Sequence, residues 1–221
     1  MYIHKQFAES DVSVLHQLIE ENPLATWVMQ YEGEIIVDHI PFILDRSRGE
    51  FGTLLGHISK ANKLWQQFDK AHNSICIFHG IQAYISPNWY ASKQEDGKAV
   101  PTWNYSVVHT YGQPAAVTDE DVLYQILART TDKFESQLNS DWTMDDAPEH
   151  YISKMLKAIQ GVEIPISQLI GKYKCSQNKS EADRLGVIAA LREQNDTQAH
   201  KMAAFIEQGL HQSATSDEYE N

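Results

Sequence analysis

The sequence has few cysteines and no long apolar run. Only Cys76 and Cys175 occur among 221 residues, and neither has a partner at CxxC spacing. We expect two free thiols, because a disulfide rarely persists in a reducing cytoplasm. The longest apolar runs span only a few residues, far fewer than the roughly 20 that cross a bilayer. The sequence therefore predicts a soluble protein without membrane segments.

Positive charge is also scarce. The 18 lysines and arginines stand against 30 aspartates and glutamates, which gives a formal net charge of −12. Such a field repels DNA phosphates unless positive residues gather locally, so a general nucleic-acid coat protein is excluded. Residues 1–7 lack the charged and then apolar layout of a secretion signal, and we expect a cytoplasmic protein.

Several catalytic and metal-binding motifs are missing as well. Gly56 is followed by His-Ile-Ser-Lys where a P-loop has Lys-Ser/Thr, and no GxSxG segment occurs. The ten histidines show neither HxH nor HExxH spacing. The sequence therefore gives no support to nucleotide hydrolysis or acyl transfer, and we expect no metal site.

What is present is a series of β-type and helical patterns. At 42% apolar residues the chain can bury a core, and no repeat or linker divides it. The patterns predict strands over Leu24–Met29, Ile35–Leu44, Phe51–Ile58, Ile75–Phe78 and Ile81–Ile85, and one long strand from Thr102 to Gln113 that extends through Ala115 to Val117. They predict a helix that begins at Ser10 or Asp11, one from the capping-box-like segment 118–121 through Leu138, and one capped at Ser180. Two more helices are predicted over Glu149–Gln160, up to Gly161, and over about Gln198–Leu210. The predicted fold class is mainly β with peripheral helices, built on one antiparallel core.

The junction at Ser59 and Lys60 has the outline of a phosphate site. A strand ends at Ser59, and apolar residues then keep helical spacing as far as Phe68. A phosphate dianion would be stabilised there by backbone N–H groups, the positive end of the helix dipole and the Lys60 ammonium. The alternative is an ordinary N-cap followed by a solvated lysine, and the spacing alone leaves both open.

Two other segments carry binding chemistry. Trp103 and Tyr105 offer flat apolar faces to a heterocycle, while Asn104 supplies hydrogen bonds to its ring. The alternative is that such aromatic residues pack in the core. The stretch 171–184 is locally basic and predicts either a second anion contact or solvated lysines at a helix entry.

The order of short segments along the chain carries a family resemblance. The segments are 2–7 (YIHKQF), 22–26 (NPLAT), 39–42 (HIPF), 52–57 (GTLLGH), 78–80 (FHG), 84–90 (YISPNWY), 100–105 (VPTWNY) and 174–178 (KCSQN). Over residues 1 to about 210 the chain closely resembles the PaiB-type FMN-binding negative transcriptional regulators. The PTWNY and SQN stretches are specific to that family.

The resemblance implies an FMN-binding split β-barrel like that of pyridoxamine-phosphate oxidases. It implies one domain over residues 1–212 with C-terminal helices, while composition predicts a disordered acidic tail over 213–221. It also implies a homodimer with FMN held where the subunits meet. Ser59 and Lys60 match the family's phosphate-binding residues, and His57 would border the flavin ring. Further cofactor-binding candidates are Trp103, Asn104, Tyr105, Lys174, Gln177 and Asn178.

Two functions stay open at this point. The first is an FMN-binding negative transcriptional regulator acting as a homodimer. The second is an FMN-dependent oxidoreductase in which the protein only positions the flavin. No helix-turn-helix with a basic recognition face is visible, so contact with promoter DNA follows from family analogy alone. No residue is identified as a catalytic acid, base or nucleophile.

Overall fold

The computed structural model describes residues 1–70 and 74–217, which group into two compact units. Unit 1 comprises Met1–Asp11, His79–Val108 and the chain from Ile170 onward. Unit 2 comprises Val12–Phe78 and His109–Leu169. The single domain expected over residues 1–212 stays a prediction.

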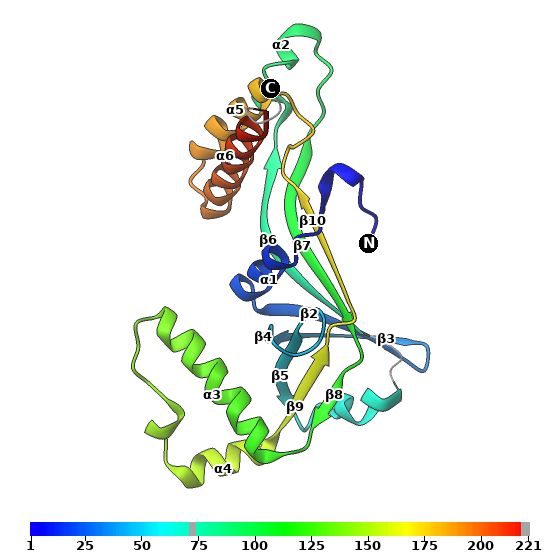
Figure 1. The fold of residues 1–221 in the computed structure, drawn as a ribbon, viewed down its shortest axis with the longest axis vertical. Helices are drawn as coiled ribbons and strands as arrows, with labels where there is room; N and C mark the ends of the chain where they lie inside the picture. Colours follow the sequence, from blue (N-terminus) through cyan, green and yellow to red (C-terminus); the bar gives the residue numbers. More distant parts are fainter. Residues whose placement is uncertain (71–73, 218–221) are drawn as a thin grey trace. The chain divides into compact units, whose positions relative to one another are not determined.

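Antiparallel sheets form the β core (Figure 1). The larger sheet has the strand order β1-β10-β7-β6-β2-β3, and the smaller has the order β4-β5-β9-β8. The larger sheet contains β1 (Ala8–Glu9), β2 (Leu24–Tyr31), β3 (Glu34–Pro41), β6 (Ser74–Ile85), β7 (Thr102–Gly112) and β10 (Gln168–Lys174). The smaller contains β4 (Ile43–Asp45), β5 (Thr53–Ser59), β8 (Ala115–Val117) and β9 (Ile159–Pro165). This arrangement confirms the predicted antiparallel fold class.

The core of unit 2 is built on β2. Ala25, Trp27 and Met29 alternate along this strand and are buried on one face of the sheet. The Trp27 ring meets Phe42 edge-on with centroids 6.0 Å apart and lies 5.5 Å from the ring of Phe68. Aromatic pairs of this kind contribute about 0.5–1.5 kcal/mol each beyond the area they bury.

Helices cover unit 2 from several directions. They are α1 (Val12–Glu21), η2 (Lys63–Lys70), α3 (Glu120–Gln137), η4 (Met144–Asp146) and α4 (Glu149–Ala158), where η denotes a 3-10 helix. Asp119, within the predicted capping segment 118–121, caps α3, because its carboxylate accepts hydrogen bonds from the N–H groups of Asp121 and Val122. Leu123 and Ile126 of α3 join Leu55 of β5 in one apolar cluster, which fixes this helix on the smaller sheet.

Unit 1 contains two C-terminal helices, α5 (Glu181–Arg192) and α6 (Thr197–Asp217), which lie side by side (Figure 1). The hydroxyl of Ser180 accepts the N–H of Asp183 and caps α5, as the sequence predicts. The buried side chains of these helices include Val187, Leu191 and Ile206. Shorter elements of the unit are η1 (Lys5–Phe7), η3 (Pro87–Trp89) and α2 (Lys93–Asp96).

Some predicted strand boundaries are wrong. The segment Ile35–Leu44 is two strands in different sheets, because the chain breaks at Phe42. The Phe42 N–H donates to Pro23 O at 2.9 Å, and its ring is buried against Trp27. The long strand predicted from Thr102 through Val117 is also two strands in different sheets, β7 and β8. Conversely, Ile75–Phe78 and Ile81–Ile85 belong to one continuous strand, β6.

The ends of two helices also differ from the prediction. Gly161 does not terminate α4, which ends at Ala158. Instead, Gly161 lies within β9, paired with His57. Pairing with β5 supplies the backbone partners from Ile159 onward and so favours extended chain over another helical turn. Helix α6 continues to Asp217, into the segment expected as a tail, and residues 218–221 lie outside the described residues.

Gly112 lies where unit 2 has no space for a side chain. A Cβ at this position would lie 2.3 Å from the carbonyl oxygen of Pro165 and 2.7 Å from Ile164 Cγ2. We expect Gly112→Ala to lower the free energy of unfolding by about 1–3 kcal/mol, because backbone must move to admit the methyl group. Urea denaturation followed by circular dichroism measures this change.

The matched control is Gly209→Ala in α6. A Cβ there meets nothing within 4 Å, and Ala is preferred over Gly within a helix by about 0.5–1 kcal/mol. The control variant should therefore be at least as stable as the parent protein. Equal stability of the two variants would contradict the close approach at Gly112.

Candidate functional site

The position of Ser59 and Lys60 is determined by the ladder between β5 and β9. In this antiparallel pair His57 lies opposite Gly161, and Ser59 lies opposite Ile159. The ladder continues one residue further, because the Lys60 N–H donates to Ala158 O at 2.9 Å. Of the two predicted phosphate-binding residues, Ser59 is therefore the last residue of a strand that is paired along its whole length, and Lys60 is the residue after it.

A tight turn then holds the backbone around these residues. The Asn62 N–H donates to Ser59 O at 3.0 Å, and the Ala61 N–H donates to Ser59 Oγ at 3.2 Å. The indole N–H of Trp65 donates to Lys60 O at 3.3 Å. Ser59 and Lys60 are both exposed. The turn thus presents a hydroxyl and an ammonium to solvent from a constrained backbone.

The helix predicted to begin at Ser59 is not there. The next helix is η2, which begins at Lys63 and is of the 3-10 type. The turn at Ser59 and the side chain of Asn62, which accepts the Leu64 N–H at 3.3 Å, delay the helix start. A helix dipole therefore contributes little at Ser59, and phosphate binding there depends on the hydroxyl and the ammonium.

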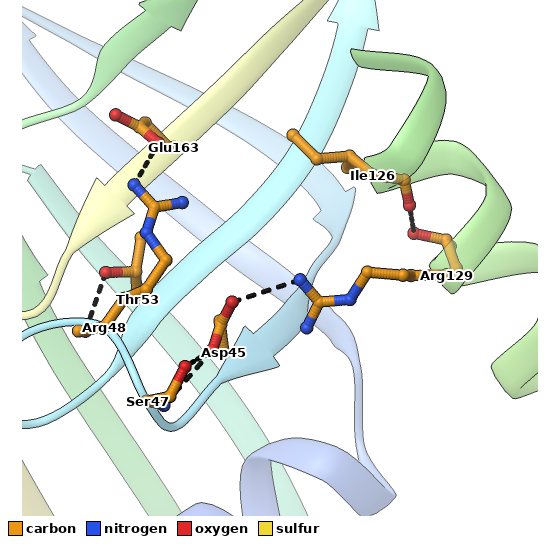
Figure 2. Close-up of polar contacts among 8 residues, drawn as sticks. Asp45, Ser47, Arg48, Thr53, Ile126, Arg129 and Glu163 are labelled. Atoms are coloured by element: carbon orange, nitrogen blue, oxygen red, sulfur yellow. Dashed lines mark hydrogen bonds and ion pairs between the residues drawn. The ribbon is translucent and has the colours of Figure 1, made fainter. Parts of the chain in front are cut away.

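Polar contacts hold the start of β5 in place (Figure 2). Arg48 forms an ion pair with Glu163 of β9 at 2.7 Å, and Thr53 Oγ1 donates to Arg48 O at 2.9 Å. Arg129 of α3 reaches Asp45 at 3.1 Å. The hydrogen bond from Ser47 and the charge of Arg129 hold the pKa of Asp45 below its usual value, although burial opposes this. The β4–β5 connection is thereby attached to both β9 and α3.

His57 is the half-buried member of this group. It lies two residues before Ser59 on the same strand, so the two side chains point to the same face of the sheet. Burial lowers the pKa of His57 from its ordinary value of 6.5, because a charged imidazole is poorly solvated there. The ring is therefore neutral at pH 7 and able both to donate and to accept a hydrogen bond.

The remaining predicted residues lie in unit 1, where the start of β7 meets the end of β10. The Lys174 ammonium donates to Thr102 Oγ1 and to Trp103 O, the latter at 2.6 Å. Asn104 donates to Ser176 Oγ at 2.8 Å. Burial and the nearby charge of Lys172 lower the pKa of Lys174. These contacts bring the PTWNY and SQN stretches together.

Two of the predicted residues have structural partners. Asn104 is only 1% exposed, and Gln177 accepts the Cys175 N–H at 2.7 Å while donating to Tyr173 O. Ser176, which accepts the hydrogen bond from Asn104 and directly precedes Gln177, has a positive φ of 64°, which is uncommon outside glycine. Asn104 and Gln177 therefore shape the turn after β10 and position its neighbours.

The aromatic residues divide between surface and core. Trp103 is 54% exposed, whereas Tyr90 is 2% exposed. Of these two residues, only Tyr90 packs in the core. Tyr105 is half-buried, with the ammonium of Lys172 5.2 Å from its ring centroid. Asn178 is exposed in the turn after β10. Trp103 and Tyr105, two residues apart on β7, share one face of that strand.

The predicted residues thus form one group in each unit, His57, Ser59 and Lys60 in unit 2 and the rest in unit 1. Two contributors were missed. Thr102 accepts a hydrogen bond from Lys174, and Tyr84 packs against Trp103 with ring centroids 5.9 Å apart. Both lie within segments that carry the family resemblance, but no spacing rule distinguishes them.

Both thiols are free, as expected, and both are buried. Burial raises the pKa of Cys76, and it raises the pKa of Cys175 to about 12. Neither sulfur is a thiolate at pH 7, so neither is a candidate nucleophile.

Residues 1–70 and 74–217 contain neither a metal-binding cluster nor a membrane-spanning helix. No cluster of three or more His, Cys, Asp or Glu side chains suits a metal ion in this part of the chain. Among these same residues, no helix has the length and apolarity needed to span a bilayer.

Comparison with solved structures defines the class of protein. The structure of the flavocytochrome Anf3 from Azotobacter vinelandii matches with a TM-score of 0.57 and 16% sequence identity, over 78% of this chain and 72% of that one. Together with the sheets described above, this likeness shows a split-barrel fold. The family described as "Putative FMN-binding domain" matches residues 1–168, and the chain belongs to that family. The match confirms the predicted family and its cofactor, FMN.

Relatives match along most of the chain. "Protease synthase and sporulation protein PAI 2" of Bacillus subtilis is 30% identical over 210 residues, which are 95% of this chain and 98% of the relative. Uncharacterized protein AN0679 of Emericella nidulans is 32% identical, and the match covers 93% of this chain and 96% of the relative.

The lowered pKa of His57 predicts a pH dependence of stability. When the pH falls below 6.5, the unfolded chain binds a proton at this residue before the folded protein does. The contribution of neutral His57 is therefore complete above pH 6.5 and is lost as the pH falls toward the folded-state pKa. We expect the free energy of unfolding to fall more between pH 7.5 and about 5.5 in the parent protein than in His57→Asn.

Urea denaturation at each pH measures the free energy of unfolding of both proteins. The contributions of the other histidines cancel in the comparison, because both proteins contain them. If the free energy of unfolding depends on pH identically in the two proteins, the pKa of His57 does not change on folding.

Proposed function

We propose that this protein is an FMN-binding negative transcriptional regulator that acts as a homodimer. Membership of the FMN-binding family supports the cofactor. The resemblance to PaiB-type regulators supports the regulatory role, as does a full-length match to PAI 2, whose name refers to protease synthesis and sporulation. The observation that carries the proposal is the Ser59–Lys60 turn, which presents phosphate-binding groups in a chain of this family.

The chemistry of this turn fits the FMN phosphate. Ser59 Oγ accepts the Ala61 N–H, which leaves its own O–H to donate to a phosphate oxygen. The exposed Lys60 side chain has no ion pair within the described parts of the chain, so its ammonium is available to a dianion. Both groups are held by backbone hydrogen bonds, so little freedom is lost when the phosphate binds.

The flavin ring requires flat apolar contacts and a few polar ones. In the proposed dimer, neutral His57 borders the ring, and Trp103 and Tyr105 offer aromatic faces to it. Lys174 and Asn178 supply polar groups near these faces, while Asn104 and Gln177 hold the turn that carries them. Bound FMN supplies a ring that accepts and gives up electrons, which would let a regulator respond to redox state.

The phosphate assignment is tested with two ligands. We expect Lys60→Ala to weaken FMN binding by roughly tenfold, because one charge-assisted contact with the dianion is removed. Riboflavin, which lacks the phosphate, should bind the parent and the variant equally. Quenching of flavin fluorescence measures both affinities.

Lys63→Ala is the matched control, because it removes the same charge from the first residue of η2. It should change FMN affinity by less than about twofold. Undiminished FMN affinity in Lys60→Ala would reject the site, and an equal loss for riboflavin would reject the role of the phosphate.

Regulation requires contact with DNA by a strongly acidic protein. Each chain has a formal net charge of −12, and a dimer doubles it, so promoter contact has to use a local basic surface. We expect the FMN-loaded protein to sediment with the mass of two chains. We expect it also to retard a DNA fragment, selected from a random library, at physiological salt.

The alternative function gives the opposite result. If no DNA is selected with or without FMN, direct repression is rejected. Reduction of the bound flavin by NAD(P)H, followed by transfer of electrons to an acceptor, would then identify an FMN-dependent oxidoreductase.

A further inference from the structure

Unit 1 contains a groove that neither the sequence patterns nor the family comparison assigns. Its volume is about 430 Å³, and its lining residues come from β6, η3, β7, the two C-terminal helices and the connection between those helices. Its walls combine aromatic, carboxamide and apolar side chains with one carboxylate. The residues are Gln82, Ala83, Tyr84, Trp89, Trp103, Leu191, Gln194, Asp196, Gln198 and Ala199.

Three aromatic side chains dominate one part of this groove. Tyr84 is 48% exposed and Trp103 is 54% exposed, and their rings meet edge-to-face at 71°. Trp89, at the end of η3, lines the same space. Large aromatic surfaces left in contact with water inside a concave site are costly unless a ligand covers them. Their electron-rich faces attract cations.

The charged side chain that lines the groove is negative. Among the described residues that line it, Asp196 is the only ionised one, and none is a lysine, arginine or histidine. Asp196 Oδ1 accepts the N–H of Gln198 at 3.0 Å, while Oδ2 has no partner within residues 1–70 and 74–217. One carboxylate oxygen is therefore free to accept a hydrogen bond from a bound group or to attract a positive charge.

We propose that this groove binds a small organic ammonium ion. The cation is attracted by the faces of Trp103, Tyr84 and Trp89, and its charge is balanced by Asp196. The carboxamides nearby are able to hydrogen-bond to neutral polar groups of such a ligand. The net charge of −12 favours the approach of cations over the whole surface.

Other ligand classes fit this groove less well. An anion would meet the Asp196 carboxylate without any compensating positive group on the walls. A neutral apolar molecule would cover the aromatic rings but leave the carboxylate unused. The ammonium ligand is a distinct proposal from flavin binding, although Trp103 contributes to both.

The test uses choline and its uncharged isostere, 3,3-dimethylbutan-1-ol. The two molecules have the same shape and differ in the positive charge, so a preference for choline isolates the cation contribution. We expect choline to bind with millimolar affinity and the alcohol to bind at least roughly tenfold more weakly. Isothermal titration calorimetry on the full chain measures binding, and tryptophan fluorescence reports contact with the groove.

Two variants remove the proposed contacts. Asp196→Asn deletes the charge but keeps a side chain that caps α6 equally well, so the fold is retained and choline affinity should fall roughly tenfold. Trp103→Leu should weaken choline by a similar factor. Glu193→Gln is the matched control, because it removes a neighbouring exposed carboxylate outside the groove and should leave choline affinity unchanged.

Three results would overturn the proposal. Equal affinity for choline and the alcohol, or an unchanged affinity in Asp196→Asn, would show that charge is not recognised. Loss of choline binding as protein concentration rises would show that a second copy of the chain covers the groove. Lys60→Ala, which tests the flavin site, should leave choline affinity unchanged.

Discussion

The antiparallel ladder between β5 and β9 is the interaction on which the proposed phosphate site depends. It pairs each residue from Thr53 to Ser59 with a residue of β9 and continues through the Lys60 N–H. Each backbone hydrogen bond contributes only about 0.5–1.5 kcal/mol net, but an unpaired buried partner would cost more. Because the ladder ends in a tight turn, a hydroxyl and an ammonium face solvent from a backbone that has little freedom to move.

Four arginines of this acidic chain are paired with carboxylates, whereas Lys60, within the described residues, is not. Arg46, Arg48, Arg129 and Arg192 each form an ion pair with a carboxylate at 2.6–3.1 Å. These side chains are about half exposed, so each pair adds little stability, but together they orient the turns and helices around the sheets. Lys60, by contrast, is held only through its backbone. Its positive charge is therefore left to a ligand.

In unit 1, polar side chains support an aromatic one. Lys174 bonds to the carbonyl oxygen of Trp103, and Asn104 bonds to Ser176, so the first residues of β7 are attached to the end of β10. The backbone of Trp103 is consequently fixed while its ring stays half exposed beside Tyr84. A preorganised aromatic face of this kind binds a flat or cationic ligand without first paying for its own ordering. Both proposals for unit 1 rely on this property.

The sequence by itself determined the local structure wherever one short segment contains all the interacting groups. Asp119 and Ser180 cap their own helices, and the alternation along β2 places Trp27 in the core. The pattern of a strand followed by helical spacing pointed to Ser59 and Lys60, and the order of motifs identified the family and added His57. Only the tertiary structure decided that Phe42 breaks a strand, that Gly161 continues one, and that Asp196 lines the same groove as Trp103 and Tyr84. Those outcomes depend on partners far away in the chain, and a local pattern contains no information about which distant residue will supply the hydrogen bond or the ring.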